Sequence, residues 1–278
     1  LKATLSQEDR NRIRDEASRL KALQTQPETP EALAALPRLK RSDIPRGVER
    51  IPFEEGRVGG IPVLKHEVFG NGIVYLDCAF DVSHVLEELQ PYLPLLGKFA
   101  RGMGAAGRRY DEMATRISMA MGGLGTQLAS GFGRDGKETW QKMIFRMRTL
   151  HRNIPEAVGL LGDILAAGDL ADRRRMEDLV LEKRNGLQAA VVPSGHLFAQ
   201  RTAASSLNLA ARRDEQWHGR LQLRLLSGLS EGFAADPLVE TMERLKRLVF
   251  RRSGLHLNVT GDAAGIALVV TGVRHFRH

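Results

Sequence analysis

The sequence predicts an α+β domain in which helices cover one face of a mostly antiparallel sheet, preceded by a helical linker segment. Short apolar runs separated by glycine turns fill residues 51–83, and this pattern is typical of antiparallel strands and hairpins. Helical periodicity dominates most of the remaining chain, and one further strand-like run, LHLNVTGD, lies at 255–262. Strands in front, helices behind and one returning strand favour a sheet with helices packed on one side.

Residues 1–48 are expected to form a separate helical segment and linker, and residues 49–278 the domain itself. Ser6 is followed by Gln7-Glu8-Asp9, which resembles a capping box at the start of a helix. Apolar residues then recur at helical spacing, at Ile13, Ala17, Leu20 and Leu23. A second, shorter helix is predicted to begin at Thr29-Pro30 and to end at Pro37. The run PRLKRSDIPRGVERIP is rich in proline and charge and has no period, which indicates a linker.

Within the domain, Gly59-Gly60 and Gly70-Asn71-Gly72 are expected to be the turns between the first strands. Apolar periodicity and capping residues then predict the later elements. We expect helices at 87–103, 109–121, 154–167, 171–190, 194–209 and 236–250, further strands at 122–132 and 137–150, and a possible helix after residue 262.

Composition bears on the class of partner. The formal charge of +8 is compatible with phosphate binding, but the Lys and Arg residues are interspersed with acids and only 5% of residues are aromatic. No stretch reaches the roughly 18 consecutive apolar residues that a membrane span needs. We therefore expect neither nucleic acid nor a membrane among the partners.

The single cysteine, Cys78, rules out an internal disulfide and a cysteine-based metal cluster. It lies in an apolar, strand-like run, so we expect it to be a small buried residue. The Arg/Ala/Gly-rich composition favours a bacterial cytoplasm, with a mitochondrial matrix as the alternative for a eukaryotic source. Because the chain begins at Leu1, we expect it to be a segment of a longer polypeptide.

The run DVSHVLEELQ, residues 81–90, contains a degenerate zinc-peptidase pattern. In the active pattern, H-x-x-E-H, two histidines one helical turn apart bind zinc and the glutamate between them activates a water molecule. Here His84 matches the first histidine and Glu87 the glutamate, whereas Glu88 replaces the second histidine. Because carboxylates also bind zinc, the substitution alone leaves a metal site open.

Three longer segments carry a more specific resemblance: ALAALPRLKRSDIPRGVERIP, GIPVLKHEVFGNGIVYLDCAFDVSHVLEELQPYLPLLG and GRRYDEMATRISMAMGGLGTQLASGFGRDG. The chain resembles the pitrilysin/insulinase family of zinc metallopeptidases, and within it the presequence protease-like members. The resemblance implies four related α/β domains, joined as two halves by a helical hairpin, around a chamber in which unfolded peptides are cut. It places residues 1–48 at the end of the hairpin and its associated segment, and residues 49–278 in the third, inactive domain. Zinc is expected only in the first domain of the parent protein.

By the same resemblance, Glu182 in MEDLVLEKRN lies near the position of the remote carboxylate ligand, with Glu177 close by. The degenerate positions are therefore His84, Glu87, Glu88 and Glu182. They provide one imidazole instead of two.

Local sequence argues against a functional ligand set. Pro91 and Pro94 follow the pattern closely, and proline is best tolerated in the first turn of a helix, so we expect the helix to start near Leu86 or Glu87. His84 would then lie on the preceding loop. Acidic residues at a helix start are also what the helix dipole favours. We therefore predict no catalytic residue, no metal ligand and no cofactor in this segment.

The leading hypothesis is a non-catalytic structural and substrate-enclosing domain of a zinc metallopeptidase. Its partners would be the other domains of the same polypeptide and unfolded peptide substrates. One alternative is a free-standing binding or assembly subunit that pairs with a separate catalytic chain. Another is a self-sufficient metallopeptidase with an altered ligand set, which would bind zinc and cleave peptides.

Overall fold

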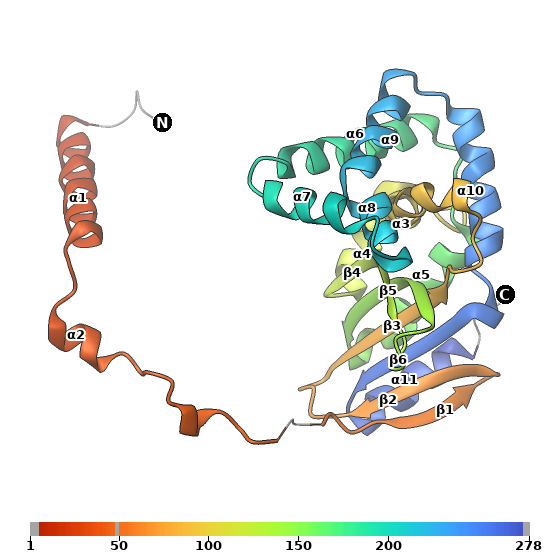
Figure 1. Ribbon diagram of the computed structural model, residues 1–278, viewed down its shortest axis with the longest axis horizontal. Coiled ribbons are helices and arrows are strands. Elements are labelled where there is room, and N and C mark those ends of the chain that lie inside the picture. Colours follow the sequence, from red (N-terminus) through yellow and green to blue (C-terminus); the bar gives the residue numbers. More distant parts are fainter. Residues whose placement is uncertain (1–5, 48–49, 275–278) are drawn as a thin grey trace. The chain divides into compact units, whose positions relative to one another are not determined.

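The computed structural model describes residues 6–47 and 50–274 (Figure 1). The chain divides into two units, Leu1–Arg50 and Ile51–His278. Their assignment to a hairpin segment and an inactive peptidase domain stays a prediction.

The first unit contains two helices that begin at the expected caps. Helix α1 spans Gln7–Thr25, and the Ser6 hydroxyl accepts a hydrogen bond from the Asp9 N–H at 3.1 Å. Helix α2 spans Pro30–Ala35, and the Thr29 hydroxyl accepts from the Ala32 N–H at 3.2 Å. A short 3₁₀ turn, η1 (Arg41–Asp43), follows. Among the described residues of α1 and α2, none is buried.

The described residues of the second unit form a six-stranded sheet in the order β1-β2-β6-β3-β5-β4. The strands are β1 (Glu54–Val58), β2 (Ile61–Glu67), β3 (Ile73–Asp81), β4 (Gly123–Phe132), β5 (Thr139–Leu150) and β6 (Leu255–Gly261). Neighbouring strands are antiparallel, except that β2 and β6 run parallel. The β1–β2 turn needs positive φ at both central positions, and Gly59 and Gly60 have φ of +54° and +87°.

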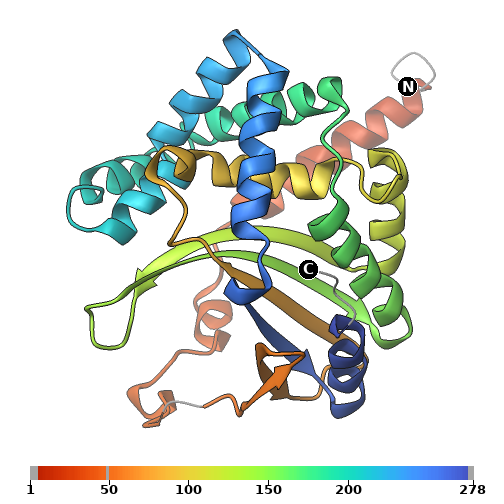
Figure 2. The same ribbon diagram turned by 90° about the vertical axis from the view of Figure 1, so that its right-hand side faces the viewer.

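Side-chain alternation along the strands separates a buried from an open face of this sheet. In β3, Val74, Leu76, Cys78 and Phe80 are buried, whereas the residues between them are half-buried or exposed. The helices gather on the buried side of the twisted sheet (Figure 2). The predicted α+β class, with helices on one face of a mostly antiparallel sheet, is therefore confirmed. Burial also raises the pKa of the Cys78 thiol, as expected of an inert core residue.

The helices of this unit follow the sequence expectations except in two places. Their bounds are η2 (Glu87–Tyr92), α3 (Leu93–Gly102), α4 (Tyr110–Ala120), η3 (His151–Asn153), α5 (Ile154–Ala167), α6 (Arg173–Ala190), α7 (Gly195–Ala204), α8 (Leu209–His218), α9 (Arg220–Glu231), α10 (Ala235–Val249), η4 (Arg252–Gly254) and α11 (Ala263–Val273). None of the described helices is long and apolar enough to cross a membrane.

The first difference is that the helix predicted at 87–103 is divided. Its first part is the 3₁₀ segment η2, which contains Pro91, and the α-helix begins only at Leu93 with Pro94 in its first turn. The second difference is that the helix predicted at 194–209 ends at Ala204, and Asn208 starts α8, because its side chain accepts from the Ala211 N–H at 2.8 Å. Helices α8 and α9 were not predicted from the sequence.

The close approach of α11 to the sheet can be tested at Gly265. A Cβ atom there would overlap Val74 Cγ2 and lie 2.6 Å from His151 Nε2, whereas a Cβ at Gly159 in α5 meets none of the described atoms within 4 Å. We expect Gly265→Ala to lower the free energy of unfolding by about 1–3 kcal/mol through overpacking. The matched Gly159→Ala should raise it by about 0.4–1 kcal/mol. Urea unfolding of both variants would measure this, and equal effects would contradict the packing of α11.

Candidate functional site

The loop that carries the degenerate motif is folded by short local hydrogen bonds before any helix begins. Asp81 Oδ1, at the end of β3, accepts from the Ser83 N–H at 2.8 Å, and the Val85 N–H donates to the Val82 carbonyl at 3.2 Å. The first helical residue is Glu87. The prediction that the helix starts near Leu86 or Glu87, with His84 on the preceding loop, is therefore confirmed.

His84 contacts the end of another helix. Its Nε2 atom lies 2.9 Å from the carbonyl oxygen of Leu248 in α10. A carbonyl oxygen can only accept, so Nε2 carries the hydrogen and donates. A metal needs a nitrogen with a free lone pair, and this contact removes Nε2 from that role.

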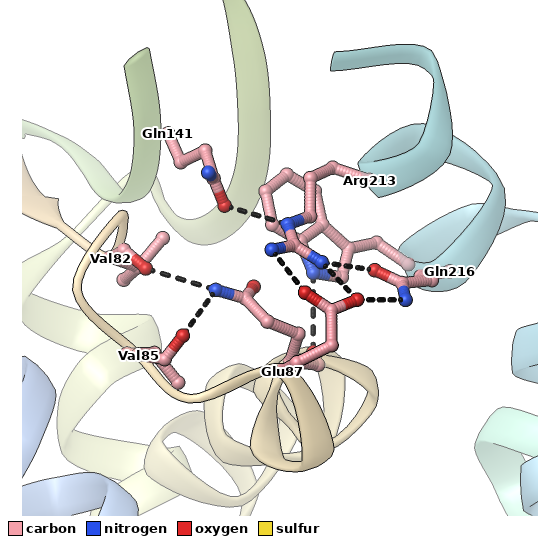
Figure 3. Close-up of polar contacts among 8 residues, drawn as sticks. Val82, Val85, Glu87, Gln141, Arg213 and Gln216 are labelled. Carbon is pink, nitrogen blue, oxygen red and sulfur yellow. Dashed lines mark hydrogen bonds and ion pairs between the residues drawn. The ribbon is translucent and has the colours of Figure 1, made fainter. Parts of the chain in front are cut away.

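Glu87, which occupies the general-base position of the pattern, is held by two side chains of α8 (Figure 3). Its two carboxylate oxygens accept from Arg213 Nη1 and Nη2 at 2.8 and 2.7 Å, and Gln216 Nε2 donates to Oε1 at 2.9 Å. Arg213 Nε also donates to Gln141 Oε1 in β5 at 2.9 Å. The guanidinium therefore joins the motif loop, the sheet and α8 at one point.

The electrostatics of this pair make Glu87 a poor proton acceptor. The side chain of Arg213 is only 6% exposed, whereas that of Glu87 is 58% exposed. Hydrogen bonds from Arg213, and then from Gln216, lower the pKa of Glu87 to about 2. A carboxylate with such a low pKa stays ionised at neutral pH but takes up a proton weakly.

Two buried polar side chains continue the network beneath the motif. Gln90 Nε2 donates to the carbonyls of Val82 and Val85 at 3.1 and 3.0 Å, and Trp217 Nε1 donates to the Gln90 carbonyl at 3.2 Å. The loop is thus supported from inside by Gln90 and from α8 by Trp217. Its conformation depends on contacts far apart in the sequence.

The two other degenerate positions lie against different cations. Glu88 is 3.7 Å from Arg244 of α10, and both side chains are about half exposed. Glu182 in α6 accepts from Lys98 Nζ of α3 at 2.6 Å, and this contact holds the pKa of Glu182 below its usual range. The nearby Glu177 is exposed.

The four degenerate positions therefore have four different partners and do not form a ligand set. Within residues 6–47 and 50–274, no group of three His, Cys, Asp or Glu side chains is placed to hold a metal ion. A zinc ion would have to displace Lys98 from Glu182 and Arg213 from Glu87. The residues present do not fit zinc, and the absence of catalytic residues stays a prediction.

A cluster of cations surrounds Glu182. Arg101 of α3 donates through Nε to the Thr126 hydroxyl and through Nη1 to the Leu124 carbonyl in β4, each at 3.2 Å. Lys183 follows Glu182 in α6 and is half-buried. Burial, and then the charges of Lys98 and Arg101, lower the pKa of Lys183 to about 8. We refer to Lys98, Arg101 and Lys183 as the cation cluster.

Sequence reasoning missed the cationic partners at both places. Arg213 lies in α8, a helix that was not predicted, and it is 126 residues from Glu87. Lys98 is 84 residues from Glu182. The adjacent pair Arg212-Arg213 inside an Asn-capped segment was the available signal for α8, but no local pattern names the acid that it contacts.

Comparison with known proteins identifies relatives along most of the chain. The family model described as associated with peptidase family M16, subfamily C, matches residues 1–229. Presequence protease 1, chloroplastic/mitochondrial, from Arabidopsis thaliana is 27% identical over 99% of this chain and 26% of that protein. The mitochondrial presequence protease of Danio rerio is 29% identical over 92% of this chain and 25% of that protein. Protein HypA of Clostridium perfringens is 24% identical over 94% of this chain and 27% of that protein. The chain thus spans about a quarter of the length of these relatives.

Solved structures share the fold at low sequence identity. The crystal structure of a peptidase M16 inactive domain from Pseudomonas fluorescens has a TM-score of 0.53 at 11% identity, over 80% of this chain and 50% of that one. A conserved protein from Enterococcus faecalis has a TM-score of 0.59 at 12% identity, over 81% of this chain and 52% of that one.

Two neighbouring arginines of α8 test the importance of the Glu87–Arg213 contact. Arg213→Ala should lower the free energy of unfolding by about 2–4 kcal/mol, because it leaves a cavity and takes the donor from buried Gln141. Arg212 is exposed, so Arg212→Ala should change stability by less than about 0.5 kcal/mol. Urea unfolding would measure both values. Similar losses in the two variants would show that the contact is not important.

The depressed pKa of Glu87 predicts an acid dependence of stability. Folding lowers this pKa from 4.5 to about 2, so the stabilisation is present above pH 4.5 and is lost as pH falls toward 2. Wild type should exceed Glu87→Gln in unfolding free energy at pH 7, and the difference should shrink as the pH is lowered. The comparison requires urea unfolding at several pH values. A difference that stays constant down to about pH 2.5 would contradict the role of the charge.

Proposed function

Because the chain belongs to the family associated with subfamily C of the M16 peptidases, we propose that it is a non-catalytic, substrate-enclosing domain of a presequence protease-like zinc peptidase. The observation that carries the proposal is that the motif carboxylates are engaged by protein cations instead of converging on a ligand site. The chain also covers only 26% of the Arabidopsis relative, as expected of one domain in a larger peptidase.

The open face of the sheet supports a role as a wall. Asp77 of β3 accepts two hydrogen bonds from Arg146 of β5, at 2.8 and 3.0 Å, on this face. Tyr75 on the same face is 43% exposed. Such a surface, with paired charges and an exposed aromatic ring, suits contact with a neighbouring domain or with an extended peptide. The partners in the proposal are the other domains of the same polypeptide and unfolded peptides.

Zinc, in this proposal, belongs to another domain of the parent protein, where an intact H-x-x-E-H pattern would supply the ligands. The role of this chain is to exclude bulk solvent and to limit the size and shape of the substrate. The names of the relatives from Arabidopsis and zebrafish include a mitochondrial location. A bacterial cytoplasm stays the compartment predicted for this chain from its composition.

Metal analysis and a peptide-cleavage assay test the proposal. After dialysis against trace zinc, the 278-residue chain should retain much less than one equivalent of zinc and should not cleave a fluorogenic peptide. A Glu88→His variant should behave in the same way, because residue 88 lies in a 3₁₀ turn and His84 is bonded to Leu248. Restoring the histidine of the pattern therefore does not restore the helix face that holds zinc.

Changing Glu182→Gln supplies the control for the remote carboxylate. Stoichiometric zinc in the wild type that is lost in this variant, together with metal-dependent cleavage, would overturn the non-catalytic assignment. It would favour the alternative of a metallopeptidase with an altered ligand set.

A further inference from the structure

The cation cluster carries more positive charge than its surroundings neutralise. Glu182 interacts with Lys98 directly, and Arg101 and Arg175 also lower its pKa through their charges. One carboxylate thus faces Lys98, Arg101, Arg175 and the adjacent Lys183. Holding like charges together away from bulk water costs free energy unless an anion compensates them.

Several N–H donors of the cluster are unused. Lys183 makes no hydrogen bond or ion pair with any of the described residues, although it is half-buried. Lys98 uses one of its three ammonium hydrogens on Glu182, and Arg101 keeps Nη2 free after donating from Nε and Nη1. Three side chains from two helices therefore keep donors that a multi-oxygen anion would accept.

The position of the cluster is fixed by the fold. Arg101 is anchored to β4 through Thr126 and Leu124. The side chain of Lys98 is only 22% exposed, and its contact with Glu182 crosses from α3 to α6. Pre-placed cations lose less conformational entropy on binding than free surface lysines do.

We propose that Lys98, Arg101 and Lys183 form a binding site for an anionic oxygen group, either a phosphate or the carboxylate of a peptide C-terminus. The ammonium of Lys183 provides the donors that no protein group accepts. Lys98 and Arg101 provide further charge and direction. This inference is independent of whether the chain encloses a peptidase chamber, because it concerns a site within one domain.

Calorimetric titration of the 278-residue chain at constant ionic strength tests the site. Three probes separate the two sources of the anion: inorganic phosphate, a short peptide with a free C-terminus, and the same peptide with an amidated C-terminus. Saturable binding of phosphate would support a phosphate site. Binding of the free-acid peptide, but not of its amide, would support a carboxylate site.

Variants show whether the cluster is responsible. Lys183→Met should weaken the observed binding at least about tenfold, whereas Lys183→Arg should retain it within a few-fold, because charge-assisted donors are restored. Lys137→Met removes one exposed lysine from the β4–β5 turn and should leave affinity unchanged. Circular dichroism would check that every variant is folded.

The proposal fails if none of the three probes binds. It also fails if Lys183→Met binds as tightly as the wild type, or if Lys137→Met weakens binding as much as Lys183→Met does. The last result would mean that the net positive charge, and not this cluster, attracts the anion.

Discussion

The buried guanidinium of Arg213 is the constraint on which the candidate site depends. Removing such a charge from water costs several kcal/mol unless an anion and further acceptors replace the lost hydration. Glu87 supplies both carboxylate oxygens, and Gln141 and Gln216 supply two amide oxygens at 2.9 and 2.6 Å. Because these acceptors come from the motif loop, the sheet and α8, all three must keep their relative positions for the charge to remain compensated. The acid at the catalytic position therefore serves the packing of Arg213.

The same exchange is repeated around the rest of the degenerate pattern. Zinc would supply positive charge to imidazole and carboxylate groups brought to one point. Here the positive charge comes from side chains: Arg213 at Glu87, Lys98 at Glu182 and Arg244 at Glu88. Each cation approaches from a different helix, so the carboxylates are drawn apart and not toward a common centre. The missing histidine is thus only one of several changes that separate this arrangement from a zinc site.

Much of this structure follows from local signals in the sequence, and the remainder does not for a physical reason. Glycine turns gave the strand boundaries, and the prolines after the motif placed the helix start at Glu87. These features depend on backbone preferences of a few adjacent residues. Helix α8 escaped because Asn208 interrupts a segment that otherwise continues as one helical pattern. The partners of Glu87 and Glu182 escaped because ion pairs depend on tertiary packing between residues 126 and 84 positions apart, which no periodicity records.

The excess of arginine has a related explanation in the glycine-rich turns. Glycine segments leave backbone carbonyls without regular partners, and an arginine can satisfy such an acceptor without any acid nearby. Arg148 donates to the Gly122 carbonyl, Arg175 to that of Gly102 and Arg57 to that of Gly60, at 3.0, 3.0 and 2.9 Å. Each such bond adds a positive charge to the fold without a matching negative one. A net charge of +8 can therefore arise from the way this domain closes its turns, and it does not require a nucleic-acid-binding surface.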